Sequence, residues 1–277
     1  MDMNSNNISP NDYRVKVKSK FSLSAFDMPD KSMSKGDKQL AIAALEKIAN
    51  EINSLQDILY AQGKHKVLLV LQGMDASGKD GTVKHVFSEC DPLGIRLASF
   101  KAPSAEELAR DYLWRVHKEV PQKGEIVIFN RSHYEDVLIV KVHDWIDDAE
   151  CKRRYAQINE FERLLAETGT TIIKCFLHIS KAEQKVRMQK RIDDPTKTWK
   201  FNPNDLKERA LWPQYMQAYE AAIAATSTDY APWYVVPADN KMNRNLLISK
   251  ILLAHLKKLK PIYPVAPADY KNIVIED

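Results

Sequence analysis

The chain has 277 residues, a formal net charge of +4 and an apolar share of 44%, which is typical of a soluble globular protein with a large core. No apolar run approaches the ~20 residues of a membrane helix, and the polar N-terminus lacks a signal-peptide pattern, so we expect no membrane association. The small basic excess argues against duplex nucleic acid as a partner. Three cysteines without metal or redox spacing, Cys90, Cys151 and Cys175, favour a reducing cytoplasm.

Residues 1–35 are polar and include a basic alternating segment at residues 14–20. They predict an N-terminal arm that lies on the domain or on a neighbouring subunit, with a disordered tail as the alternative. Residues 37–61 have apolar side chains at helical spacing, among them Leu45 and Ile52, and predict a long helix. We expect Gly63 to end this helix.

A phosphate-binding loop (P-loop) follows the first helix. Residues 67–71 are apolar and predict a buried strand, and residues 73–79 have the spacing G-x-x-x-x-G-K before a predicted helix at residues 81–88. The glycines let backbone N–H groups surround an anion, and the lysine adds charge for the terminal phosphates. The predicted phosphate ligands of this region are Gly73, Ala76, Ser77, Gly78, Lys79, Asp80, Gly81 and Lys84.

Two carboxylates distinguish this loop from the usual pattern. Asp75 lies inside it, and Asp80 stands where Ser or Thr usually holds Mg²⁺. A carboxylate beside a polyphosphate is repelled unless a divalent cation lies between them. We therefore predict that Asp75 and Asp80 face a metal ion. The alternative is that Asp75 is an ordinary solvent-facing side chain.

Two strands and a helix come next. Residues 96–101 predict the second strand, residues 104–107 form a capping box that opens a helix through about Lys118, and residues 125–130 predict the third strand. The polar string N-R-S-H-Y-E-D at residues 130–136 follows directly. Other P-loop enzymes often place an Asp that orders Mg²⁺ at this position.

This polar string supplies the second half of the predicted active site. Arg131 suits bidentate phosphate contact, and Glu135 and Asp136 provide carboxylates for a metal ion or an acceptor. A capping cluster with surface ion pairs is the alternative. The predicted catalytic residues are thus Asp75, Lys79, Arg131 and Glu135, and the predicted metal ligands are Asp75, Asp80, Glu135 and Asp136.

A basic segment follows a predicted helix at residues 150–167 and a fourth strand at residues 170–178. Residues 181–200 contain seven basic and three acidic side chains, which indicates an anionic partner. A capped helix begins at Ser180 and breaks at Asp194-Pro195. We predict a lid at about residues 187–204 that contacts phosphates through Arg187, Arg191, Lys197 and Lys200. A solvated helix face is the alternative.

The remaining elements are a helix at residues 205–226, a fifth strand at residues 233–236 and a last helix at residues 243–258. Strands that alternate with helices predict an α/β three-layer sandwich built on a five-stranded parallel sheet. We expect a single domain at residues 36–264 between the arm and a C-terminal tail at residues 265–277. The P-loop is then at the carboxyl end of the first strand, beside the ends of its neighbours.

Several blocks of the sequence together resemble the polyphosphate kinase 2 family. They are LQGMDASGKDGTVKHV, SFKAPSAEELARDYLWRVHKEVP, IFNRSHYEDVLIVKVH, RIDDPTKTWKF and YAPWYVVPADNK, and the resemblance extends over residues 14–264. It implies a thymidylate-kinase-like fold with a helical lid. It also implies phosphoryl transfer between inorganic polyphosphate and nucleoside mono- or diphosphates with Mg²⁺, or with Mn²⁺ in its place. We further expect a homodimer or homotetramer.

The motifs transfer residue by residue. Asp75 and Lys79 match the catalytic positions of the family's P-loop, Arg131 matches an arginine of its second motif, and Arg191, Lys197 and Lys200 match lid positions. The diphosphate-using branch resembles D-R-S-W-Y-N-R where this chain has N-R-S-H-Y-E-D. The latter is similar to the branch that accepts both monophosphates and diphosphates.

The resemblance predicts in-line transfer from a polyphosphate end to AMP or ADP, or to GMP or GDP. Because the acceptor is already an oxyanion, positioning and charge neutralisation matter more than a general base. Two alternatives are an ATP-dependent small-molecule kinase of the same fold and a sensor that binds polyphosphate or nucleotide without turnover. A GTPase is disfavoured because Asn240-Lys241-Met242-Asn243 lacks the final Asp of the guanine-reading motif.

Overall fold

The computed structural model describes residues 9–17, 21–26 and 35–275. Its centre is a parallel sheet of five strands in the order β2-β3-β1-β4-β5. The strands are β1 (Lys66–Gln72), β2 (Ile95–Ser99), β3 (Ile126–Asn130), β4 (Thr170–His178) and β5 (Trp233–Pro237). Central parallel strands are buried on both faces, which explains the continuous apolar run of β1. The predicted five-stranded parallel sheet is confirmed.

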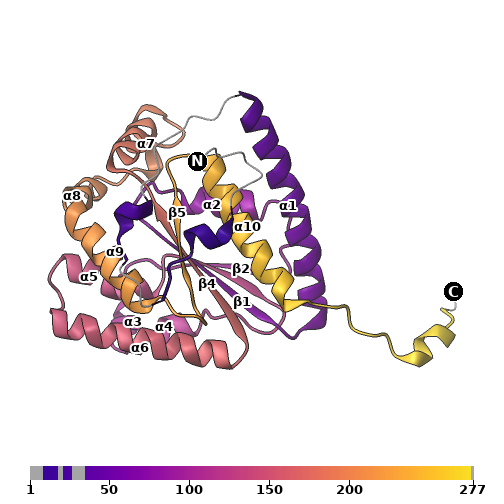
Figure 1. The fold of residues 1–277 in the computed structure, drawn as a ribbon. Helices are drawn as coiled ribbons and strands as arrows, with labels where there is room; N and C mark the ends of the chain where they lie inside the picture. The colour runs from indigo at the N-terminus through magenta and orange to yellow at the C-terminus, as the bar shows by residue number, and fades with distance from the viewer. Residues whose placement is uncertain (1–8, 18–20, 27–34, 276–277) are drawn as a thin grey trace.

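Helices cover both faces of the sheet, as Figure 1 shows. One layer contains α1 (Lys35–Gln62), α2 (Lys79–Val86) and α10 (Lys241–Leu259), with α10 packed between α1 and α2. The other contains α5 (Ile139–Val142), α6 (Asp148–Glu167) and α9 (Trp212–Thr226). This is the predicted three-layer arrangement. Among the described residues, no helix is long and apolar enough to cross a membrane.

The segment predicted as a lid lies at the carboxyl edge of the sheet. Residues 187–204 extend from the second half of α7 (Lys181–Asp193) through the 3₁₀ turn η4 (Thr198–Lys200) to the start of α8 (Asn204–Ala210). Because α7 begins soon after the end of β4, and α2 soon after the end of β1, both helices start at the same edge. The sheet topology thus brings the basic segment to the P-loop side of the molecule (Figure 1).

Two predicted helices are each divided in the structure. The capping box at Ser104 is formed, but α3 (Ala105–Leu108) ends early and α4 (Trp114–His117) follows separately. The Asp111 carboxylate accepts from Leu113 N at 3.0 Å, a local bond that competes with a continuous helix. The helix predicted over residues 205–226 breaks at Leu211, and Pro213, which lacks an N–H, lies in the first turn of α9.

Short segments flank the domain. Within the described part of the N-terminal arm, η1 (Pro10–Tyr13) and η2 (Leu23–Phe26) are 3₁₀ turns, and Val15 N donates to Trp233 O at 2.9 Å beside β5. The arm therefore lies on its own domain at this point; the rest of residues 1–35 falls partly outside the described residues. The tail beyond α10 contains η5 (Ala268–Asn272) and extends away from the domain (Figure 1).

Candidate active site

The P-loop connects β1 to α2 and needs its glycines. Gly73 and Gly78 have φ angles of 152° and 104°, which side chains rarely adopt. A Cβ at Gly73 would be 2.8 Å from Leu177 O, and one at Gly78 would be 2.0 Å from Arg244 Nη1. Backbone geometry and close packing therefore both require glycine at these two positions.

Lys79 is at the centre of the predicted catalytic residues. Its ammonium is buried and donates to Gly73 O at 2.6 Å, inside the loop. Burial lowers the pKa of Lys79, while the nearby carboxylates of Asp75, Glu135 and Asp80 act in the opposite direction. The three carboxylates therefore lie near enough to Lys79 for their charges to act on its ammonium.

Arg131 completes this group from the end of β3. Its Nη2 donates to Asp75 Oδ1 at 2.8 Å, and Asn130 Nδ2 donates to Asp80 Oδ1 at 2.8 Å. Burial disfavours the charged form of Arg131, but Glu135 and Asp75 outweigh this effect and raise its pKa. Its φ of 63° is a strained conformation, of the kind that functional sites retain when the surrounding structure enforces it.

Gln72, the last residue of β1, positions Glu135 and was not predicted. With its amide oriented to match its neighbours, Gln72 donates to Glu135 Oε1 at 3.1 Å and accepts from Ser132 N at 3.2 Å. Gln72 is fully buried, so these bonds have little competition from water. A polar residue directly after the apolar run at residues 67–71 was the available signal.

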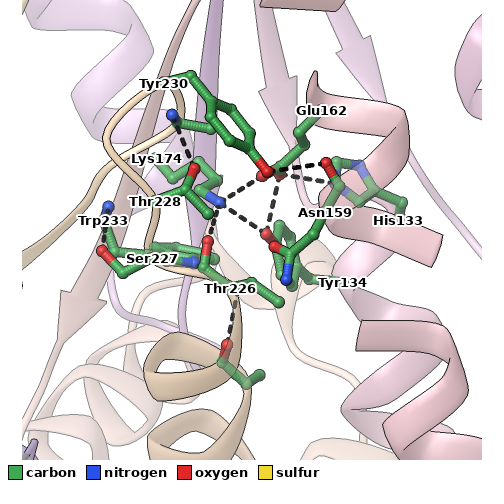
Figure 2. Close-up of polar contacts among 12 residues, drawn as sticks. His133, Tyr134, Asn159, Glu162, Lys174, Thr226, Ser227, Thr228, Tyr230 and Trp233 are labelled. Carbon is green, nitrogen blue, oxygen red and sulfur yellow. Dashed lines mark hydrogen bonds and ion pairs between the residues drawn. The ribbon is translucent and has the colours of Figure 1, made fainter. Parts of the chain in front are cut away.

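A buried polar network holds the turn between Arg131 and Glu135 (Figure 2). Glu162 of α6 accepts from Tyr134 Oη at 2.8 Å and lies 3.2 Å from His133 Nε2. Lys174 of β4 donates to Glu162 at 2.5 Å, to Tyr134 Oη at 2.8 Å and to Thr226 O at 2.8 Å. Burial would raise the pKa of Glu162, but Lys174 and His133 outweigh it and lower the pKa.

Asp136 differs from the other predicted metal ligands. Burial raises the pKa of Asp136 to about 6, although the nearby charges of Arg115 in α4 and Arg154 in α6 act in the opposite direction. Its backbone oxygen accepts from Arg154 Nη1 at 2.9 Å. Asp136 belongs to the 3₁₀ turn η3 (His133–Val137), and its role as a metal ligand stays a prediction.

The remaining carboxylates fit a magnesium ion bound jointly with substrate. Within the described ranges, no three His, Cys, Asp or Glu side chains gather as a ready-made metal site. Mg²⁺ is commonly bound by one or two carboxylates together with waters and substrate phosphates. Asp75 and Asp80 at the mouth of the P-loop meet this requirement. Their metal-binding role stays a prediction.

The predicted lid cations separate into two groups. Arg187 is buried, and its Nη1 donates to Ala76 O and Ser77 O at 3.0 Å each, on the back of the P-loop. Contrary to our expectation, it contacts the loop's carbonyls and does not point toward a phosphate position. It faces this way because α7 packs directly against the outer side of the loop.

The other cations are accessible. Arg191 is half-exposed and Lys197 and Lys200 are exposed, with Lys197 paired to Asp194 and Lys200 lying 4.9 Å from the Trp199 ring centre. Asp205 of α8, which was not predicted, is close enough to Asp75 and Arg191 for both to influence its pKa, which burial and Asp75 raise. Asp205 thus lies near both Asp75 of the P-loop and Arg191 of the predicted lid. Lys84 is exposed on α2, more than one turn after Lys79.

A parallel sheet, a glycine loop with a buried lysine and carboxylates at the same edge define a P-loop kinase. The chain belongs to the polyphosphate kinase 2 family, whose sequence model matches residues 35–263. This confirms the family resemblance.

Named relatives extend over nearly the whole chain. It is 54% identical over 264 residues to the AMP/ADP-polyphosphate phosphotransferase of Meiothermus ruber, a match that covers 95% of this chain and 99% of the relative. It is 45% identical to the ADP-polyphosphate phosphotransferase of Rhodopseudomonas palustris, over 80% of this chain and 82% of the relative. The crystal structure of polyphosphate kinase 2 from Arthrobacter aurescens TC1 has a TM-score of 0.89 and 44% identity, and covers 96% of this chain and 95% of that one.

Proposed function

We propose that this protein is a polyphosphate:nucleotide phosphotransferase that moves phosphoryl groups between inorganic polyphosphate and AMP or ADP. The observation that carries the proposal is the meeting of Lys79, Arg131 and the carboxylate of Asp75 at the mouth of a P-loop. The similarity to the Meiothermus enzyme over 95% of the chain supports polyphosphate as donor and both adenine nucleotides as acceptors.

The residues of the site act mainly by positioning and charge. Lys79 and Arg131 neutralise the negative charge that spreads over the transferred phosphoryl group, and loop N–H groups fix its orientation. Asp75 and Asp80 would hold Mg²⁺, which supplies charge neutralisation between the two phosphate chains. Glu135, which accepts a hydrogen bond from Gln72, would contact the acceptor phosphate.

The lid contributes the remaining cations. Arg191, Lys197 and Lys200 are accessible to a long anionic chain, and their closure over the site would exclude water. This matters because water is a competing acceptor for the phosphoryl group. We also propose that the enzyme works in the cytoplasm as a homodimer or homotetramer, which light scattering of the purified protein would test.

A phosphotransfer assay tests the proposed function directly. Initial rates are measured with polyphosphate and Mg²⁺ and with AMP, ADP, GMP or GDP as separate acceptors, and again with ATP as the only donor. We expect product from polyphosphate with AMP and with ADP. Faster transfer from ATP to AMP or to other small molecules would identify an ATP-dependent kinase. Binding of polyphosphate without any transfer would identify a sensor.

A further inference from the structure

Two guanidinium groups lie side by side against the back of the P-loop. Arg187 of α7 donates to Ser77 O at 3.0 Å, and Arg244 of α10 donates to the same oxygen at 3.1 Å. Their exposed fractions are only 7% and 2%. Two positive charges are therefore buried next to each other, which is unfavourable unless something nearby compensates for them.

The compensation differs between the two arginines. Arg187 is paired with Glu183 at 2.7 Å. Within the described residues Arg244 has no carboxylate partner, and its Nε and Nη2 donate to the neutral Asn245 Oδ1 at 3.1 and 2.8 Å. Burial, and then the charge of Arg187, lower the pKa of Arg244 to about 9. Arg244 thus carries a buried charge that the protein itself does not neutralise.

The position of Arg244 relates this charge to the anion site. Its guanidinium lies directly behind Gly78, and its Nη2 is 3.4 Å from a Cβ built at Gly81, so it lies below the first turn of α2. The C=O of Ser77 and the N–H of Gly78 belong to one trans peptide unit and point in opposite directions. Holding the Ser77 carbonyl toward the arginines therefore turns the Gly78 N–H toward the mouth of the loop.

We propose that Arg244 is a positioning residue of the P-loop, which aims the Gly78 N–H at the bound phosphate and places an unneutralised positive charge behind it. The inference rests on the proposed role of this loop in binding polyphosphate. It also explains why a costly buried charge is kept, because the bound polyanion supplies the missing negative charge.

The test compares Arg244→Met and Arg244→Lys with the wild type. Met removes the charge and roughly keeps the length of the side chain, and Ser77 O keeps Arg187 as a donor. Tripolyphosphate with Mg²⁺ is the probe, and its Kd is measured by calorimetry. We expect Arg244→Met to raise this Kd about tenfold or more and Arg244→Lys to raise it less. The Tm of the ligand-free Arg244→Met variant should be equal to or above that of the wild type.

Kinetics give a second readout that a structural role alone would not change. Arg244→Met should raise the KM for polyphosphate several-fold more than the KM for AMP. The matched control is Arg163→Met, which removes an exposed arginine paired with Glu160 and Glu167 on α6. It should change neither the KM for polyphosphate nor the KM for AMP. A lower Tm for Arg244→Met with unchanged Kd and KM would reduce Arg244 to a packing residue and overturn the inference. If Arg244→Met does not fold, a Kd for Arg244→Lys equal to that of the wild type overturns it equally.

The two proposals fail in different ways. A wild-type protein that does not bind tripolyphosphate contradicts the proposed function and the inference together. A wild type that binds it, with both Arg244 variants binding equally well, contradicts the inference alone.

Discussion

At the scale of single residues, the candidate site depends on charges that compensate one another across the P-loop. Asp75 is bonded to Arg131 at 2.8 Å, and both influence the charge state of Lys79. Removing any one of them leaves the others without their present partners. Such groups act as a unit, so each single substitution should lower activity strongly. The losses from combined substitutions should not add up.

The first prediction concerns the P-loop. We expect Lys79→Ala and Asp75→Asn each to lower kcat by on the order of a hundredfold or more, because in the proposed mechanism both act on charge in the transition state. Initial rates with polyphosphate and ADP measure the effect, and circular dichroism confirms folding. Near-normal turnover in either folded variant would remove that side chain from the mechanism.

The second prediction concerns acceptor length. A monophosphate is one unit shorter than a diphosphate, and a carboxylate at position 135 would hold a cation or an ordered water in the resulting gap. Glu135→Asn should therefore lose AMP phosphorylation while it keeps a substantial part of ADP phosphorylation. Initial rates of the Glu135→Asn variant with AMP and with ADP, at saturating polyphosphate and Mg²⁺, test this prediction. Equal losses for both acceptors would instead give Glu135 a general catalytic or structural role.

At the scale of elements, α7 connects the P-loop to the lid. Through Gln184 and Arg187 it holds the carbonyls of residues 75–77, while its C-terminal end leads into the exposed cations. One helix therefore has a buried half that shapes the loop and an accessible half that faces solvent. Only the second half is expected to contact polyphosphate directly.

The third prediction separates the exposed cations of the lid from the rest of the site. Lys197→Ala and Lys200→Ala should raise the KM for polyphosphate more than the KM for the nucleotide, because we propose that these lysines contact the long chain. The difference should shrink at high salt, since exposed charge contacts are screened. Equal changes for both substrates would leave the basic segment as a solvated surface only.

The fourth prediction concerns the buried network under the Arg131 turn (Figure 2). Glu162→Gln or Lys174→Met alone leaves one buried charge unpaired and should lower the free energy of unfolding by about 3–5 kcal/mol. The double variant should recover part of this loss. Urea unfolding measures the loss in the single variants and the recovery in the double variant. In the single variants kcat per folded molecule should also fall, because Arg131 and Glu135 flank the turn. Additive losses in the double variant would contradict a coupled pair.

At the scale of the whole molecule, α10 joins the sheet, the P-loop and the other helices of its layer. Arg244 near its start contacts the loop, and His255 near its end lies 2.9 Å from the Tyr234 hydroxyl in β5. Burial, with help from Lys258 and Arg14, lowers the pKa of His255 to about 4. His255 therefore stays neutral in the folded protein over a range in which the unfolded chain is protonated.

The fifth prediction follows from this pKa. Since the folded pKa of His255 is below its unfolded value near 6.5, its contribution to stability is lost as pH falls from about 6.5 to 4. Relative to His255→Gln, the wild type should lose about 3 kcal/mol of unfolding free energy between pH 7 and pH 4. Denaturant unfolding at several pH values measures this. Parallel pH profiles for the two proteins would show that His255 titrates normally.

The sequence alone determined the features that depend on near neighbours. The P-loop, the capping box at Ser104, the N-cap at Ser180, the strand at residues 170–178 and the break at Asp194-Pro195 were all predicted and are present. Each depends on residues within one or two turns of chain, so periodicity and turn chemistry suffice to identify them. The sequence also predicted Arg131 beside the P-loop, but that contact depends on β1 and β3 being neighbours in the sheet, which no local pattern fixes.

Tertiary structure decided where long-range partners lie. Arg187 was assigned to phosphate from its charge, yet it bonds to Ala76, which is 111 residues away. Arg244 and the Glu162–Lys174 pair gave no local signal, and the polar end of β1 did not show that Gln72 would bond to Glu135. The charge of a side chain and its spacing in the sequence indicate which ligands it is able to bind. Strand order and helix packing determine which partner it meets, because those contacts join segments that no local pattern relates.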